Sequence, residues 1–154
     1  IEKVVEKCLS QYVGGNEYFD KLDEHIKFDT EIIGAMLSKH IISGKILILS
    51  GEFGRQVRNY LKEHRPEQDF ILLKGSPRKL ERVSIEDALI TKMSYLGIFL
   101  DDSYFSGGTF FYAKGFVESM YNIFITDALV AYDGSRHKKE YVHSFYRYYD
   151  NYKG

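Results

Sequence analysis

The pattern that most restricts how this chain can fold is an alternation of short apolar runs with amphipathic segments between residues 29 and 133. An apolar run of about five residues without polar alternation is typical of a strand that is buried on both faces of a parallel sheet. Segments in which apolar residues recur every three or four positions are typical of helices. The resulting order of strand, helix, strand, helix, strand, helix, strand predicts a three-layer, doubly wound, mainly parallel α/β sheet.

Most of the expected elements have a recognisable beginning or end. The expected strands are KILILS, DFILLK, IFL and NIFITDALVAYD, at residues 45–50, 69–74, 98–100 and 122–133. Helices are expected from Asp29 or Thr30 to Gly44, from Gly51 to His64, from Ser84 to Gly97, and after the glycines at 107 and 108. Ligands of doubly wound sheets bind beyond the carboxyl ends of the strands, so the loops after these strands are the expected site.

Length and charge restrict the class of protein. The 154 residues predict a single domain, with a core at about 29–133 and flanking segments at 1–28 and 134–154. With 21 Lys and Arg against 22 Asp and Glu, the chain lacks the basic field of a nucleic-acid-binding protein. Apolar runs stay well below about 18 residues, and the beginning lacks the apolar core of a signal peptide, so no membrane association is expected. A single Cys permits no internal disulfide, which favours the cytoplasm.

The segment IFLDDSYFSGGTF, residues 98–110, combines an apolar strand, two adjacent carboxylates and a glycine turn that opens a helix. Glycines allow a tight turn with accessible backbone N–H groups, and the helix N-terminus adds partial positive charge. Such a turn favours a phosphate monoester, with the Ser106 and Thr109 hydroxyls as further donors. The carboxylates suit the vicinal hydroxyls of a ribose or a Mg²⁺ ion close to them. The segment therefore predicts a site for a ribose 5-phosphate.

This segment resembles the phosphoribosyl-pyrophosphate (PRPP) binding loop of the type I phosphoribosyltransferases. The family pattern is a hydrophobic strand, two acidic residues, three variable residues, Thr or Ser, Gly, any residue and Thr, and residues 98–109 match it without departure. The resemblance implies the family's core sheet, with a small hood built from the terminal segments. It also implies Mg²⁺-dependent transfer of ribose 5-phosphate from PRPP to a nucleobase or similar nitrogen acceptor, with release of pyrophosphate.

The resemblance implies roles for individual residues. Asp101 and Asp102 would hold the ribose hydroxyls close to the Mg²⁺ ion, as catalytic and metal-binding residues, and backbone amides of the following loop would wrap the 5-phosphate. The expected ligands are PRPP or a nucleoside monophosphate. The implied binding residues are Asp101, Asp102, Ser103, Tyr104, Phe105, Ser106, Gly107, Gly108 and Thr109.

Two other loops are candidates for contact with the pyrophosphate. The loop after the first strand offers Gly51, Gly54 and Arg55, but Glu52 places a negative charge there, and a strand-to-helix turn without a ligand is the alternative. The second strand is followed by a basic segment that resembles the one with which orotate-type members meet pyrophosphate. Its cations would neutralise the leaving group as catalytic residues, and a solvated basic loop is the alternative. These cations are Lys74, Arg78 and Lys79.

The sequence says less about which base is the acceptor and about the oligomeric state. Phe105 stands where enzymes acting on 6-oxopurines usually carry an acid, which argues against hypoxanthine or guanine. Aromatic residues recur at helical spacing over residues 141–152 and predict a helix. That helix would pack on the domain or on a second subunit of a homodimer, or stack on a base. The histidines show no metal-ligand spacing, and His40 is expected in the core.

More than one function is compatible with these motifs. An enzyme that uses PRPP is favoured by the basic segment after the second strand. A regulatory module of the same fold, which binds PRPP or a nucleotide without catalysis, is favoured by Glu52 and by the absence of an obvious general base. A receiver-like phosphoacceptor domain is a third possibility, but the Ser-Gly-Gly-Thr turn fits it poorly.

Overall fold

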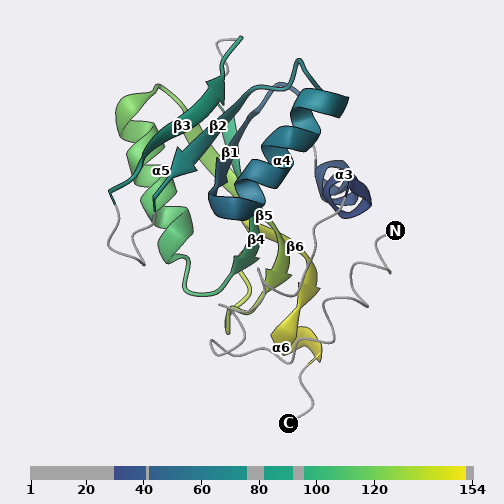
Figure 1. Ribbon diagram of the computed structural model, residues 1–154. Coiled ribbons are helices and arrows are strands. Elements are labelled where there is room, and N and C mark those ends of the chain that lie inside the picture. The colour runs from purple at the N-terminus through teal and green to yellow at the C-terminus, as the bar shows by residue number, and fades with distance from the viewer. Residues whose placement is uncertain (1–29, 41, 76–81, 92–95, 152–154) are drawn as a thin grey trace.

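The computed structural model describes residues 30–40, 42–75, 82–91 and 96–151, and in them six strands form one sheet (Figure 1). The order across the sheet is β3-β2-β1-β4-β5-β6. Neighbouring strands are parallel except β3, which runs antiparallel to β2. The strands are β1 (Ile46–Ser50), β2 (Phe70–Lys74), β3 (Ser84–Leu89), β4 (Leu96–Tyr104), β5 (Phe124–Asp133) and β6 (Val142–Arg147).

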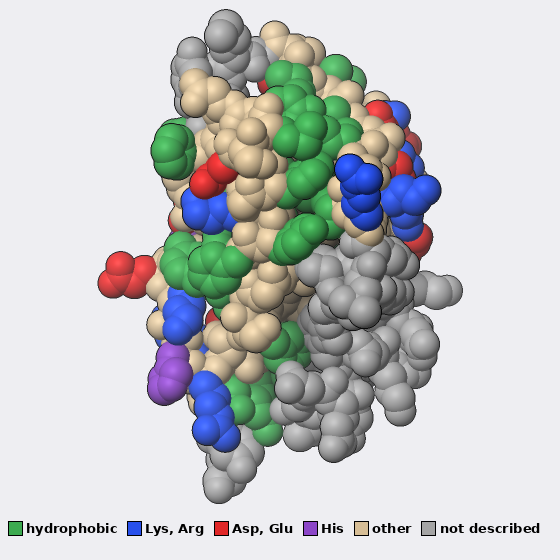
Figure 2. Space-filling model, turned by 90° about the vertical axis from the view of Figure 1, so that its left-hand side faces the viewer, with side chains coloured by type: hydrophobic (Ala, Val, Ile, Leu, Met, Phe, Trp, Pro, Cys, Tyr) green, Lys and Arg blue, Asp and Glu red, His purple; other side chains and the backbone are tan. Residues whose placement is uncertain are grey.

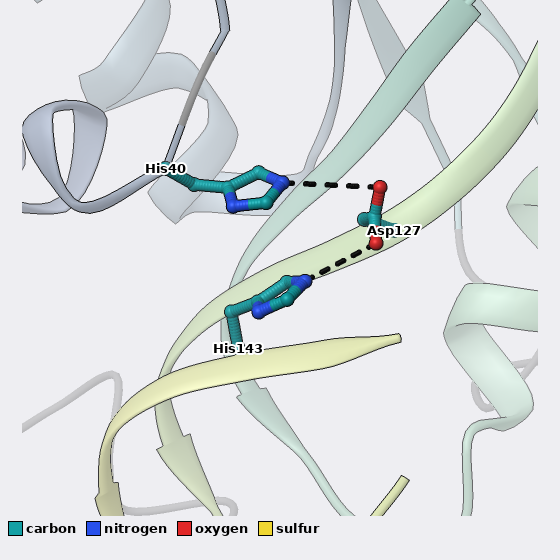
Figure 3. Close-up of side chains that lie close together, drawn as sticks. All are labelled: His40, Asp127 and His143. Atoms are coloured by element: carbon teal, nitrogen blue, oxygen red, sulfur yellow. Dashed lines mark hydrogen bonds and ion pairs between the residues drawn. The ribbon is translucent and has the colours of Figure 1, made fainter. Parts of the chain in front are cut away.

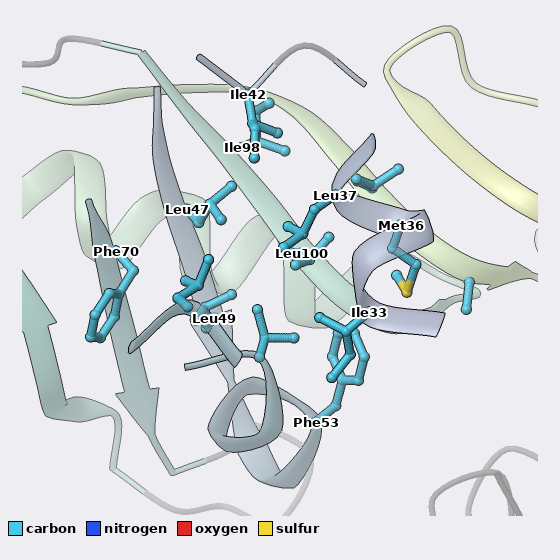
Figure 4. Packing of buried hydrophobic residues seen from close by; sticks show 14 of the residues in the cluster. Ile33, Met36, Leu37, Ile42, Leu47, Leu49, Phe53, Phe70, Ile98 and Leu100 are labelled. Carbon is cyan, nitrogen blue, oxygen red and sulfur yellow. The ribbon is translucent and has the colours of Figure 1, made fainter. Parts of the chain in front are cut away.

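Helices cover both faces of this sheet, which confirms the expected three-layer α/β arrangement. The helices are α3 (Thr30–Lys39), α4 (Gly51–His64), α5 (Gly108–Met120) and the short α6 (Tyr148–Asn151). Met36 of α3 and Phe53 of α4 pack with Leu47 and Leu100 on one face of the sheet (Figure 4). Helix α5 packs on the opposite face through Phe110 and its neighbours. None of the described helices is long and apolar enough to cross a membrane.

Residues 84–89 form β3 at the edge of the sheet, so the helix expected from Ser84 to Gly97 is wrong. Ser84 and Asp87 have the spacing of a helix start, but β3 instead pairs with β2 and its acidic side chains are bound by α4. The Arg55 guanidinium donates to both carboxylate oxygens of Glu86 at 2.8 to 3.2 Å, and Lys62 donates to Asp87 at 3.0 Å. These tertiary contacts outweigh the weak local preference for a helix.

The Tyr-rich tail forms β6 and α6, so the single helix expected over residues 141–152 is also wrong. Strand β6 pairs parallel with β5 from Val142 to Arg147. Val142 and Phe145 are buried, and Tyr146 stacks on Tyr132 with ring centroids 5.6 Å apart. Pairing with the exposed edge of β5 satisfies main-chain groups that an isolated helix would have satisfied internally. The tail therefore extends the sheet, while the flanking segment 1–28 lies outside the described residues.

Strand β4 is longer than the strand expected at residues 98–100, because β5 pairs with it as far as Tyr104 and Asp133. Strands β1, β2, β4 and β5 run parallel to one another, so their carboxyl ends meet at one edge of the sheet (Figure 1). That edge is where doubly wound folds bind their ligands.

Candidate phosphate-binding site

A cavity of about 300 Å³ lies where β4 ends and α5 begins. Ten consecutive or nearly consecutive residues supply its lining, so the site is built almost entirely by one strand-turn-helix unit. The lining residues are Phe99, Asp101, Ser103, Tyr104, Phe105, Ser106, Gly107, Gly108, Thr109 and Phe110. Eight of the nine residues expected to bind PRPP, all except Asp102, are thus brought together around one cavity.

The turn of this unit depends on Gly107, which precedes α5 and has a φ of 83°. A Cβ atom at this position would lie 2.5 Å from the Tyr104 hydroxyl, closer than real side chains approach. The Gly107 carbonyl accepts the first helical hydrogen bond, from the Phe111 N–H at 2.9 Å. Glycine is therefore needed here both for the backbone conformation and for the close approach of Tyr104.

The amino end of α5 carries the features of an anion site. The first N–H groups of a helix lack intrahelical partners and bear partial positive charge. The first turn of α5 contains no acidic residue that would neutralise this charge. The Ser106 hydroxyl lies next to the turn, where it accepts a long hydrogen bond from the Gly108 N–H at 3.4 Å. Ser106, Gly107, Gly108 and Thr109 all border the cavity, and an anion such as a phosphate is the kind of ligand that this end of a helix favours.

The two adjacent carboxylates occupy different environments because successive side chains of a strand point to opposite faces. Asp101 is half-buried and lines the cavity, and its carboxylate accepts from the Asp102 N–H at 2.9 Å. Asp102 is buried and accepts from the Ser103 hydroxyl at 3.1 Å. Asp101 therefore offers its carboxylate to the cavity directly, whereas the Asp102 carboxylate is buried and does not line it.

Two residues distant in the sequence, Gly134 and Tyr141, contact the turn between β4 and α5 and hold it in place. The sequence pattern did not associate either residue with this turn. The Gly134 N–H donates to the Tyr104 carbonyl at 2.8 Å. A Cβ atom on Gly134 would lie 2.3 Å from the ring of Phe105. The Tyr104 and Tyr141 hydroxyls lie 2.8 Å apart, and burial together with this hydrogen bond raises the pKa of Tyr104 well above its ordinary value. Tyr104 is thus a neutral phenol that links the turn to the residue before β6.

A buried ion pair supports the loop after β5. Arg147 of β6 lies 3.5 Å from Asp133, and its guanidinium donates to the Ser135 carbonyl at 2.7 Å. The Asp133 carboxylate also accepts from the Ser135 N–H at 2.9 Å and from the Ser135 hydroxyl at 2.6 Å. The Asp-Gly-Ser sequence indicates a turn here, but nothing in the local sequence identifies Arg147 as its partner.

Gly51, Gly54 and Arg55, the residues of the first-strand loop expected to contact pyrophosphate, are not among the described residues that line this cavity. Gly51 begins α4, and Gly54 is buried where a Cβ atom would lie 2.9 Å from Leu72 and 3.2 Å from the Leu49 backbone, which is a packing contact. Arg55 is held by Glu86, and Glu52 accepts a further hydrogen bond from it at 3.3 Å. The hydrogen bond that Arg55 donates to the Glu86 carboxylate is the largest cause of the raised pKa of Arg55.

The basic segment after β2 is described only in part. Lys74 is exposed at the carboxyl end of β2, on the same edge of the sheet as the cavity. Arg78 and Lys79 lie outside the described residues. Their contact with pyrophosphate stays a prediction, as does that of the first-strand loop.

Comparison with known proteins supports the fold. No protein-family model matches the sequence, and no curated protein matches it significantly. Among solved structures, the orotate phosphoribosyltransferase of Mycobacterium tuberculosis H37Rv, in complex with inorganic phosphate, superposes with a TM-score of 0.53 at 11% identity and covers 79% of this chain and 72% of its own.

Two further structures superpose less closely. The purine phosphoribosyltransferase of Pyrococcus horikoshii Ot3 has a TM-score of 0.48 at 15% identity, over 75% of this chain and 78% of its own. A hypoxanthine phosphoribosyltransferase of Staphylococcus aureus has a TM-score of 0.48 at 10% identity, over 77% of this chain and 69% of its own. The superposition on the orotate phosphoribosyltransferase, together with the strand order and the turn between β4 and α5, identifies the architecture. The chain has the fold of the type I phosphoribosyltransferases.

Proposed function

We propose that this chain is a phosphoribosyltransferase that transfers ribose 5-phosphate from PRPP to a nucleobase or similar nitrogen acceptor and releases pyrophosphate. The observation that carries the proposal is the cavity between β4 and α5, in which the Ser106-Gly107-Gly108-Thr109 turn and the Asp101 carboxylate border one volume. A phosphate at the helix terminus and a diol at the carboxylate are the two ends of a ribose 5-phosphate.

The 5-phosphate would bind to the turn. Free N–H groups at the start of α5 would donate to the phosphate oxygens, and the Ser106 and Thr109 hydroxyls would add further donors. The positive φ of Gly107 supports this role, because it turns the chain so that successive N–H groups converge. Binding of this kind needs no cluster of Lys and Arg, which agrees with the near-neutral charge of the chain.

The ribose hydroxyls would meet the acidic pair. Asp101 is the stronger candidate for a direct contact because its side chain borders the cavity. Asp102 is buried beside it and would position Ser103, whose hydroxyl donates to it. The oxygen donors here suit Mg²⁺, which keeps several waters and binds to one or two carboxylates together with substrate phosphates. When bound, Mg²⁺ would neutralise charge on the pyrophosphate.

Departure of the pyrophosphate would be assisted by cations at the same edge of the sheet. Positive charge close to the leaving group stabilises a transition state in which the bond from the ribose C1 to pyrophosphate is largely broken. Lys74, which is exposed at the end of β2, would contribute, with Arg78 and Lys79 as further candidates. Phe105 still argues against a 6-oxopurine acceptor, since no acid occupies its position.

We also propose that the enzyme is a cytoplasmic homodimer. Apolar side chains gather on the face of the molecule that carries α5 (Figure 2). Several of them are more than two-fifths exposed, which is unusual for a face in permanent contact with water. These side chains are Leu96, Phe111, Tyr112, Met120 and Phe124.

The proposal is tested by calorimetric titration with PRPP and Mg²⁺, followed by assays of pyrophosphate release with a panel of bases. We expect the wild type to bind PRPP, and Asp101→Asn to weaken binding by more than about tenfold, because the ribose loses a charged hydrogen-bond partner. The control Asp87→Asn removes a carboxylate on β3, away from the cavity, and should leave binding unchanged. Absence of binding at millimolar PRPP would contradict the proposal, and PRPP binding without pyrophosphate release for any base would indicate a regulatory module instead.

A further inference from the structure

Two histidines and one aspartate converge on the face of the sheet covered by α3 (Figure 3). His40 follows α3, Asp127 lies near the amino end of β5, and His143 is the second residue of β6. Asp127 lies six positions before Asp133 on β5, and Asp133 pairs with Tyr104 beside the proposed PRPP site. At about 3.3 Å per residue of strand, this cluster lies roughly 20 Å from that site, at the opposite edge of the sheet.

The three side chains direct their ligand atoms at one another. Nε2 of His143 lies 3.1 Å from one Asp127 oxygen, and Nε2 of His40 lies 3.8 Å from the other. The two imidazole rings stack with centroids 4.2 Å apart, and one ligand atom from each residue falls within 4.8 Å of the others. Metal–ligand bonds of about 2.0–2.1 Å place the ligands of a tetrahedral ion about 3.3 Å apart. The three ligand atoms, which lie within 4.8 Å of one another, would therefore have to approach by at most about 1.5 Å to hold an ion.

The donor set selects a class of metal. Imidazole nitrogens suit zinc and its transition-metal neighbours, whereas Mg²⁺ and Ca²⁺ prefer a shell of oxygen atoms. Two neutral histidines and one carboxylate leave an ion such as Zn²⁺ with one positive charge and with room for water at a fourth position. The site is accessible, since 24% of His40, 23% of Asp127 and 30% of His143 side-chain surface is exposed.

Neighbouring groups prepare the ligands. The Thr126 hydroxyl donates to Asp127 at 2.7 Å and orients the carboxylate, as outer-shell partners do in metal sites.

From this geometry we propose that His40, Asp127 and His143 bind one divalent transition-metal ion, with Zn²⁺ as its representative. The three residues are separated by 87 and 16 positions along the chain, a spacing that matches no local metal-binding motif. The sequence pattern therefore predicted His40 as a core residue and not as a ligand. The ion would fasten the end of α3 to β5 and β6, at a distance from the proposed PRPP site.

The test is titration of the full chain, dialysed against a chelator, with Zn²⁺ in the absence of PRPP. We expect one ion per chain and a rise in the thermal unfolding midpoint. His143→Ala and Asp127→Asn should each weaken Zn²⁺ by at least the roughly 10- to 100-fold that loss of an outer-shell partner costs. The matched control His64→Gln removes an exposed histidine on α4 and should bind as the wild type does.

Co²⁺ supplies a second measurement that does not depend on stability. We expect visible absorption bands of a four- or five-coordinate Co²⁺ ion in the wild type and in Asp101→Asn, and their loss in His143→Ala. Retention in Asp101→Asn separates this site from the PRPP site, so either proposal can fail alone. Unchanged Zn²⁺ affinity in both His143→Ala and Asp127→Asn, or absence of binding by the folded wild type at micromolar Zn²⁺, would overturn the proposal and leave the three residues as a hydrogen-bonded cluster.

Discussion

The hydroxyl groups of Tyr104 and Tyr141 lie 2.8 Å apart and join the last residue of β4 to the residue before β6. The same Tyr104 hydroxyl lies so close to Gly107 that a Cβ atom on that residue would be only 2.5 Å from it. One phenol therefore connects the phosphate turn with the tail of the chain. The shape of the candidate site depends on residues that are far apart in the sequence.

Gly107→Ala is expected to abolish phosphate binding at the turn. An Ala side chain would be strained at a φ of 83° and would collide with Tyr104, at a cost of about 1–3 kcal/mol. The turn would have to move, and its N–H groups would no longer converge. Calorimetry with PRPP, or NMR titration with inorganic phosphate, measures the loss.

Gly108→Ala is the matched control for this change. A Cβ atom at position 108 meets only the Ser106 hydroxyl, at 3.6 Å, so the variant should fold normally and retain most of its phosphate affinity. Equal losses in the two variants would show that the turn does not depend on the contact between Gly107 and Tyr104.

Tyr104→Phe and Tyr141→Phe are expected to be less damaging together than the sum of their separate effects. Each single change removes the same hydrogen bond, which contributes about 0.5–1.5 kcal/mol. A double-mutant cycle by urea unfolding should give a coupling energy of that size. Additive effects would mean that the two hydroxyls are bonded to water rather than to each other in solution.

Gly54→Ala is expected to destabilise the fold without a specific effect on PRPP. The added methyl would press on Leu72 and on the Leu49 backbone, which costs about 1–3 kcal/mol in a packed interior. Gly115→Ala is its control, because that glycine lies inside α5 with open space around it and the change should stabilise by about 0.5–1 kcal/mol. A large loss of PRPP affinity in folded Gly54→Ala would instead favour a ligand at the first-strand loop.

The carboxylate of Glu118 is expected to make stability depend on pH. Burial opposes its charge, but Lys114 and the Ile125 N–H outweigh burial and lower its pKa in the folded state below the ordinary value of 4.5. Its contribution is therefore complete at neutral pH and is lost as pH falls through the lowered pKa. Glu118→Gln should cost about 0.5–1 kcal/mol at pH 7 and progressively less below about pH 4.5.

The difference in the free energy of unfolding between the wild type and Glu118→Gln is measured by urea unfolding from pH 7 to pH 3. Glu63→Gln serves as the control, because the side chain of Glu63 is 78% exposed and the change should leave stability nearly constant over the range. A difference for Glu118→Gln that persists unchanged to pH 3 would rule out the ionised carboxylate as its cause.

Local patterns were sufficient for the central strands and for the turn between β4 and α5. The runs at β1 and β2 are continuously apolar, and eight of the nine residues from Asp101 to Thr109 line one cavity. Both kinds of signal lie within a few positions of the sequence. The central strands and the order of strand, turn and helix around residues 98–110 were therefore predicted correctly from local patterns.

Distant contacts decided the elements that were predicted wrongly. Ser84 and Asp87 have a helix-like spacing, but Arg55 and the edge of β2 make that segment a strand. The tail has tyrosines at helical spacing, but the free edge of β5 takes it as β6. The roles of Gly134 and Arg147 beneath the turn were likewise invisible, because their partners lie on other segments.

The contact between Phe105 and Gly134 has a consequence for the evolution of this chain. The ring at position 105 fills the space that any side chain at position 134 would need. The side chains at the two positions therefore compete for the same space. A homologue with a larger residue at position 134 should carry a small one at position 105. Under the proposed function an acid at position 105 would serve a 6-oxopurine acceptor, so we predict that positions 105 and 134 change together between homologues that use different acceptors.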